Sequence, residues 1–215
     1  AGKEMLVIAP THAEGDEVTD AIRKRLQQAG IVSKDEKTIP ILKSTNWTEA
    51  EKGDAERYNG NEIVQFVKNT GAFKAGQRVA SGQLLGASRA VPAASFAVYT
   101  PDEIRIGAGD VIRATGNGWD VTRKHRINNG AQYTVERVDE KGIALTNGWT
   151  LHRDFGHLAH GYVSTSFASQ GKTVDRVLIA TGTDSPAINA EQFYVSASRG
   201  RESLRIYSGI PLSEL

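Results

Sequence analysis

Residues 160–175 read HGYVSTSFASQGKTVD, and residues 192–201 read QFYVSASRGR. Each block has the pattern of a junction between a buried strand and a polar turn. In open α/β sheets, such junctions lie at the strand ends, where ligands are bound. The two blocks therefore predict an α/β sheet that presents polar side chains to a nucleotide or a nucleic acid.

The tripeptide Gly171-Lys172-Thr173 is not part of a P-loop. That pattern needs a glycine five positions before Gly171, so that successive backbone N–H groups wrap the phosphates, and Ser166 stands there. No other stretch of the chain has the pattern, and no acidic pair after an apolar strand offers a magnesium ligand. We therefore expect the chain to hold only part of a nucleotide motor and to hydrolyse no ATP alone.

Composition narrows the class of protein. The chain has 215 residues, of which 39% are hydrophobic and 24% charged, which is ordinary for a soluble protein. No apolar stretch approaches the roughly 18 residues of a membrane span, so we expect a cytoplasmic protein. The absence of cysteine excludes disulfides and Cys-ligated zinc. The five histidines are scattered, and we expect no metal site from this chain.

A net charge of +1 does not by itself indicate nucleic-acid binding. Charge is nevertheless concentrated between Arg113 and Arg126, where Asp120 is the one acid. The segment contains Trp119 and the cations Arg113, Arg123, Lys124 and Arg126, with His125. A basic loop with an aromatic side chain suits phosphates and stacked bases, but a solvated hairpin tip is an equally good interpretation.

Two separated α/β pieces bracket the rest of the chain. Residues 5–10 form a short apolar run that ends at Pro10, as in a buried parallel strand, and apolar residues then recur at helical spacing from Val18 to Ala29. Near the C-terminus, 176–180 is a predicted strand, 189–199 a helix and 203–208 a final strand.

Residues 38–155 have short alternating segments typical of β structure. The predicted strands are 62–67, 110–113, 132–138 and 143–145, and 128–130, 139–142 and 147–148 are signals for hairpin turns between paired strands. A short helix capped by a threonine is expected within 45–51, and 80–95 is expected to be loop. The simplest architecture is a RecA-like α/β domain, residues 1–37 and 156–215, with an SH3-like β-barrel insertion at 38–155.

The same residues resemble the helicase portion of TraI/TrwC-type conjugative relaxases, which are RecD-like helicases of superfamily one. The resemblance covers nearly the whole chain, and the two opening blocks resemble helicase motifs five and six. It is carried by residues 6–15, 47–52, 124–130, 154–162 and, most specifically, 168–175.

This resemblance implies the second motor domain of an ATP-dependent 5′-to-3′ single-strand DNA helicase that acts in conjugative DNA transfer. It implies an upstream RecA-like domain that carries the P-loop and binds ATP with Mg²⁺, and a relaxase domain further upstream. No tightly bound cofactor is expected on this chain, and the implied partner is single-stranded DNA.

The resemblance also assigns roles at the nucleotide. Arg199 stands where motif six places an arginine finger, which neutralises charge on the transferring phosphoryl group; Arg201 is the substitute. Gln170, Gly171, Lys172 and Thr173 are placed at the γ-phosphate. The alternatives are a surface salt-bridge arginine at 199 and a plain turn glycine at 171.

Other residues are candidates for the DNA track. Ser164 and Thr165 are placed by the family pattern to bond backbone phosphates. Phe167 departs from the pattern, because many relatives have His there and a phenyl ring cannot bond phosphate. Thr11 and His12 are candidates too, unless they only cap the following helix. From the basic segment, Trp119, Arg123, Lys124 and Arg126 are added.

Two other functions remain open. The chain could be a non-motor module in which the β insertion binds single-stranded nucleic acid and the α/β part is scaffold. It could also be a protein-interaction platform, although neither an amphipathic surface helix nor a large exposed apolar run supports that. His157 and His160 are expected to orient backbone rather than bind a metal.

Overall fold

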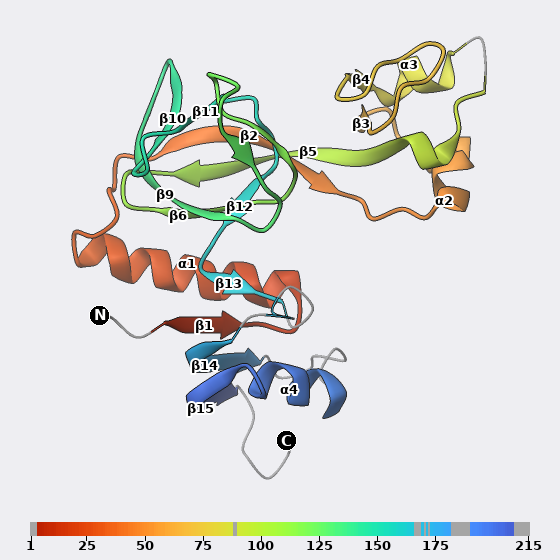
Figure 1. Cartoon of the computed structure of the whole chain (residues 1–215). Coiled ribbons are helices and arrows are strands. Elements are labelled where there is room, and N and C mark those ends of the chain that lie inside the picture. The colour runs from red at the N-terminus through yellow and green to blue at the C-terminus, as the bar shows by residue number, and fades with distance from the viewer. Residues whose placement is uncertain are drawn as a thin grey trace.

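The computed structural model describes residues 4–87, 90–165, 169, 171, 173–181 and 190–208. A parallel sheet with helix α1 (His12–Gln28) beside it lies below a β module, and a smaller β unit extends from the far end of two long strands (Figure 1). The chain enters the β module after α1 and returns from it to the parallel sheet.

The parallel sheet is built from both ends of the sequence. Its order is β13-β1-β14-β15, and every neighbouring pair is parallel. Leu6, Ile8, Val177 and Ile179 form its core. The α/β bracket predicted from the sequence is therefore confirmed. The strands are β1 (Met5–Ile8), β13 (Val163–Ser164), β14 (Val174–Thr181) and β15 (Gly200–Ser208), with α4 (Ala190–Ala197) between the last two.

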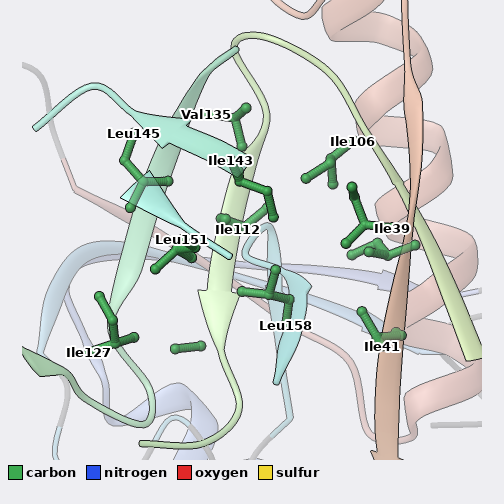
Figure 2. Close-up of a cluster of buried hydrophobic side chains, with 12 residues drawn as sticks. Ile39, Ile41, Ile106, Ile112, Ile127, Val135, Ile143, Leu145, Leu151 and Leu158 are labelled. Carbon is green, nitrogen blue, oxygen red and sulfur yellow. The ribbon is translucent and has the colours of Figure 1, made fainter. Parts of the chain in front are cut away.

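A five-stranded antiparallel sheet forms the main body of the β module. Its order is β11-β10-β9-β6-β12. Twelve buried side chains fill the space between this sheet and strands β2 and β5, ten of them labelled in Figure 2, including Ile39, Ile112 and Leu151. The strands are β6 (Val111–Ala114), β9 (Gln132–Asp139), β10 (Gly142–Leu145), β11 (Thr150–Leu151) and β12 (Leu158–His160).

One long strand belongs to two cores. β5 (Phe96–Ile106) pairs with β2 (Lys37–Ser44) from Tyr99 to its end and with β3 (Ile63–Phe66) at its start, and β4 (Arg78–Ala80) completes the sheet β2-β5-β3-β4. Ile104 and Ile106 pack in the main core, whereas Phe96 and Val98 pack with β3 and β4 in a second core. The smaller unit is thus tied to the main body by continuous backbone.

Strands β2 and β5 are absent from the sequence prediction, and each contains a proline. Pro40 lies on the edge strand β2, and Pro101 lies where β5 has β2 as its neighbour and β3 has already ended. Proline is tolerated at such positions because its missing N–H faces no partner strand. The same prolines interrupt the alternating pattern in the sequence.

Two further local predictions were wrong. Residues 80–95 were expected to be loop, but contain α3 (Ser81–Leu85) and the 3₁₀ helix η2 (Ala93–Ser95). The turn at 128–130 joins β8 (Arg126–Ile127) to β9, which are not paired with each other, since β8 pairs with β7 (Gly118–Trp119). The turns at 139–142 and 147–148 do connect paired strands.

The threonine-capped short helix is confirmed as α2 (Glu49–Gly53), with Thr48 and Glu51 in a capping box, followed by η1 (Ala55–Arg57). Within the described residues, no helix is long and apolar enough to cross a membrane. The same residues contain no group of three His, Asp or Glu side chains suited to holding a metal.

Candidate nucleic-acid interface

A pocket of about 310 Å³ lies at the carboxyl edge of the parallel sheet. β1 and β13 are parallel neighbours, so the residues that follow them meet at one edge. Four predicted DNA-track residues, two from each strand end, line this pocket: Thr11, His12, Ser164 and Thr165. The structure therefore brings together positions that are about 150 residues apart in sequence.

Thr11 is the N-cap of α1, as the alternative interpretation held. Its hydroxyl accepts a bond from the Glu14 amide at 3.2 Å and donates to the Glu14 carboxylate at 2.7 Å, while the Thr11 amide donates to that carboxylate at 3.0 Å. His12 opens the helix and is exposed. Ser164 is buried, and its carbonyl accepts from the Ala9 amide at 3.1 Å.

The far wall of this pocket comes from the β module. Nε of Arg113 and Nδ1 of His160 are buried there without a hydrogen-bond partner in the described part of the chain. Burial lowers the pKa of Arg113, and burial followed by the Arg23 charge lowers the pKa of His160 to about 4. The imidazole is therefore neutral at pH 7. Acids line the pocket too, namely Asp16, Asp20 and Glu103.

Three of the predicted nucleotide-site residues, Thr173, Arg199 and Arg201, lie at the opposite, amino edge of the sheet. Thr173 precedes β14, and Arg199 and Arg201 flank the first residue of β15. The Val174 amide donates to the Arg199 carbonyl at 2.9 Å, which joins the two segments. One Arg201 guanidinium nitrogen lies 3.9 Å from the Asp175 carboxylate.

The Arg199 side chain folds back over the end of α4. Its Nε donates to the Val195 carbonyl at 3.0 Å, and Nη2 donates to the Ser198 hydroxyl at 3.0 Å. These bonds satisfy helix-end groups and are not a salt bridge. The position stands next to Thr173 at the same edge, but the guanidinium is held by its own helix.

Gly171 has φ +79°, a conformation that favours glycine, and a Cβ there would meet nothing within 4 Å. This geometry fits the plain turn interpretation of Gly171. Gln170, Lys172 and Phe167 lie outside the described residues.

A larger groove, of about 950 Å³, lies between the β7–β8 hairpin and the β3–β4 unit. Trp119, Arg123 and Arg126 of the basic segment line it, and Lys124 does not. The Trp119 side chain is 52% exposed, although most tryptophans bury their rings. Trp149, by contrast, packs against the main core.

The loop that carries the cations is organised by a buried carboxylate. Asp120 is 2% exposed and accepts bonds from the amides of Lys124 and His125 at 3.0 and 3.1 Å, and from the Thr122 hydroxyl at 2.7 Å. The His125 ring lies 3.0 Å from the carboxylate and stacks on Trp149. Burial raises the pKa of Asp120, but these hydrogen bonds together lower it well below its usual range.

The opposite wall of the groove is tied to its floor by Arg78 of β4. Its guanidinium donates to the carbonyls of Asp154 and Phe155 at 2.7 and 2.6 Å, and its Nε donates to the Gln65 amide oxygen at 3.0 Å. Nε2 of His157 lies 2.8 Å from the same oxygen, so this nitrogen carries the proton. His157 thus contacts the Gln65 side chain, whereas the sequence prediction had it orient backbone.

Sequence reasoning missed Arg78 and Gln65 at the groove, and Lys43 and Arg105 at the edge pocket. These side chains come from strands β2, β3, β4 and β5, and of these only β3 was predicted. No local motif surrounds them, and so the single sequence carried no signal for them.

Comparison with known proteins shows that this chain is similar to helicases. A model of the viral superfamily 1 RNA helicase core domain matches residues 110–208. The multifunctional conjugation protein TraI of Escherichia coli is 22% identical over 230 residues, which cover 97% of this chain. The chain resembles the TraI-type conjugative relaxase-helicases. The TraI protein of E. coli strain K12 gives 21% identity over the same share of the chain.

The TraI-type resemblance inferred from the motifs is therefore confirmed, and it extends through the β module. The chain spans 13% of the length of these TraI proteins. Two Pif1 helicase structures are also similar: one from Bacteroides in complex with ADP-AlF3 and single-stranded DNA, and one from Candida albicans. Each is 13% identical with a TM-score of 0.48, covers 97% of this chain and is matched over 41% and 45% of its own length. Scores below 0.5 do not establish a common fold.

Proposed function

We propose that this chain is the second motor domain of an ATP-dependent 5′-to-3′ single-strand DNA translocase that acts in conjugative DNA transfer. The observation that carries the proposal is the TraI similarity over 97% of the chain. It is supported by the sorting of the motif residues to two edges of one parallel sheet. The direction of movement rests on family analogy alone.

In this proposal the carboxyl-edge pocket holds part of the DNA track. The Thr165 hydroxyl and His12 contact backbone phosphates, a kind of contact that positions a strand without reading its sequence. Ser164 is buried, and its carbonyl bonds to the Ala9 amide, so its part in the proposed track is to hold the end of β13 against β1. Thr11 acts chiefly by capping α1, because its hydroxyl hydrogen is already used by Glu14.

The amino edge faces the nucleotide of a preceding RecA-like domain, which supplies the P-loop and the Mg²⁺ ligands. Arg199 is the proposed arginine finger, and Gln170, Gly171, Lys172, Thr173 and Arg201 are the proposed neighbours of the phosphates. To reach a γ-phosphate, the Arg199 guanidinium must leave the Val195 carbonyl and the Ser198 hydroxyl. Both bonds are donated by a charged guanidinium to neutral acceptors, and bonds of this kind contribute about 1.5–3 kcal/mol each.

We also propose that residues 1–37 and 156–215 form the RecA-like domain and that residues 38–155 are an SH3-like insertion. Support comes from the five-stranded sheet wrapped against β2 and β5 around one core. Among the described residues, strand pairing divides this arrangement into two separate sheets. An isolated parallel bridge between Ile41 of β2 and Gly156 links them.

The proposal is tested by binding and turnover measured on the same chain. We expect fluorescence anisotropy to show binding of the chain to labelled oligo(dT), weaker binding to a blunt duplex, and no ATP hydrolysis with or without DNA. Thr165→Ala is expected to weaken binding, whereas Ser208→Ala, on β15, leaves it unchanged. ATP turnover by the chain alone would contradict the division of labour between two domains.

A non-motor, single-strand binding module is the second candidate. The groove beside Trp119 favours it, because that surface needs no nucleotide edge. It predicts that the chain binds single strands but that Arg199 substitutions alter no activity of any longer protein that contains it.

A further inference from the structure

We propose that the groove between the β7–β8 hairpin and the β3–β4 unit is a preorganised site for single-stranded nucleic acid, with a base stacked on Trp119 and phosphates held by Arg123 and Arg126. The inference deepens the proposed function, because it takes the same class of ligand at a second surface. It adds a wall, Gln65 and Arg78, that lies in a different part of the β module.

The charges of the groove are available to a ligand. Arg123 and Arg126 are exposed and form no ion pair with any described residue. Of the two acids that line the groove, Asp120 is bonded to His125, Thr122 and two backbone amides, whereas Asp154 is exposed. Arg78 adds a third positive charge at the opposite wall, where carbonyls hold its guanidinium; burial lowers its pKa, and the nearby Asp154 charge opposes that effect. The lining thus has three arginines against two carboxylates, one of them already bonded, and favours an anion.

The backbone conformation of the loop between β7 and β8 supports a binding role over a solvated hairpin tip. Arg123 has φ +57°, a left-handed conformation that is costly for a side chain with a Cβ. The buried Asp120 carboxylate and the His125–Trp149 stack hold the loop in this form. Strain of this kind persists where the surroundings over-determine it, which is common at binding sites.

Trp119 selects for unpaired bases. Its ring is half exposed at the groove beside Arg126, its partner across the β7–β8 ladder. At Gly118, a Cβ would lie 2.5 Å from Cε2 of Phe155, so glycine lets the hairpin approach the groove floor closely. An exposed aromatic face next to free guanidinium groups is the combination that binds single strands without sequence preference.

The test measures binding of the chain to labelled oligo(dT) and oligo(rU) of equal length across a range of salt concentrations. Trp119→Ala is expected to weaken binding about 5- to 150-fold with the salt slope unchanged. Arg123→Ala/Arg126→Ala is expected to reduce the slope of log K against log salt by about 0.7 for each phosphate that the protein no longer neutralises. Lys24→Ala/Lys141→Ala removes two exposed cations that do not line the groove and is the matched control.

The two nucleic acids and a polyanion without bases separate the sources of binding. Comparable losses with oligo(dT) and oligo(rU) support a site for any single strand, and a loss with one alone assigns it to that nucleic acid. Heparin binding is expected to depend on the arginines and not on Trp119. Parent affinity in both groove variants, or a Trp119→Ala effect equal for heparin, would overturn the proposal.

Failure of the groove leaves the motor proposal standing, since that rests on the TraI similarity and the two sheet edges. Conversely, normal turnover in Arg199→Ala within a longer protein would remove the motor and leave the groove. Circular dichroism and thermal unfolding check that Trp119→Ala folds normally. We expect both to match the parent, because Trp119 belongs to none of the three hydrophobic clusters of the described residues.

Discussion

Arg23 on α1 and Asp110, in the loop between β5 and β6, form a bidentate buried ion pair across 87 positions of sequence. Nε donates to one carboxylate oxygen at 2.9 Å and Nη2 to the other at 2.8 Å, while Asp110 also accepts from the Gly107 amide and the Tyr162 hydroxyl. The pair joins the helix of the parallel sheet to the β module. Because Arg23 lines the pocket at the carboxyl edge of the parallel sheet, the pair also holds one wall of that pocket in place.

Removing one partner of this pair is expected to be costly. The side chains of Arg23 and Asp110 are 7% and 0% exposed, so Arg23→Ala leaves a buried carboxylate without its cation. We expect a loss of about 3–5 kcal/mol in unfolding free energy. Lys37→Ala breaks the exposed pair with Asp35 and is expected to cost under about 1 kcal/mol. Urea denaturation measures the unfolding free energy of both variants. Equal losses would show that the Arg23–Asp110 pair is not buried in solution.

The stability of the chain is expected to fall as the pH drops from about 6.5 to about 4. Burial, followed by a nearby arginine charge, lowers the pKa of both His157 and His160 to about 4. Unfolded histidine has a pKa near 6.5, so between these values the unfolded chain binds protons that the folded chain does not.

Denaturation at several pH values tests this sign. His157→Gln/His160→Gln should flatten the pH dependence above pH 4, while the loss below pH 4, where carboxylates titrate, should remain. An unchanged slope in the double variant would show that other groups produce it.

Two glycines with the same backbone conformation are expected to differ in tolerance. Gly109 and Gly130 have φ +87° and +86°; a Cβ at Gly109 would collide with the Ile31 carbonyl oxygen, whereas at Gly130 it would meet nothing within 4 Å. Gly130→Ala is expected to cost about 1–2 kcal/mol from backbone strain alone. Gly109→Ala should cost clearly more. Thermal unfolding compares them, and equal costs would refute the close packing of this loop on the end of α1.

The loop at Asp120 gives a local prediction. Asp120→Asn weakens the acceptor for the amides of Lys124 and His125, so their hydrogen exchange should quicken while that of the main-core strands stays the same. Faster exchange throughout the β module would indicate global destabilisation instead.

The backbone of Arg123 gives a second prediction for this loop. Arg123→Gly should be more stable than Arg123→Ala by about 1 kcal/mol or less, since glycine accepts φ +57° at no steric cost.

The sequence predicted the central strands β1 and β14 well because each is an apolar run with buried side chains, such as Leu6 and Ile8 on β1. It failed at β2 and β5, where Pro40 and Pro101 interrupt the pattern, and where pairing with a partner about 60 residues away decides the structure. Long-range pairing of this kind leaves little trace in local periodicity.

The candidate sites divide in the same way. Thr11 was predicted because it follows the first strand and Thr165 because the family pattern places it at DNA, and the topology brings both to one pocket. Arg78 could not be predicted, because its role depends on the carbonyls of Asp154 and Phe155, 76 and 77 positions away. The sequence also could not predict the contact of Arg199 with the end of α4, because a motif identifies which residue stands at a position and not the rotamer of its side chain.

The most direct test of the account is the kinetics of Arg199→Ala in the longer protein that carries the P-loop domain, measured as DNA-stimulated ATP hydrolysis beside nucleotide affinity. A finger acts on charge that develops in the transition state, so we expect kcat to fall on the order of 10³-fold with the nucleotide Kd within about tenfold of the parent. Arg205→Ala, an exposed arginine of β15, is the control and should keep parent turnover. Parent-like kcat in Arg199→Ala, or equal loss of kcat and binding, would contradict the assignment of this chain as the second motor domain.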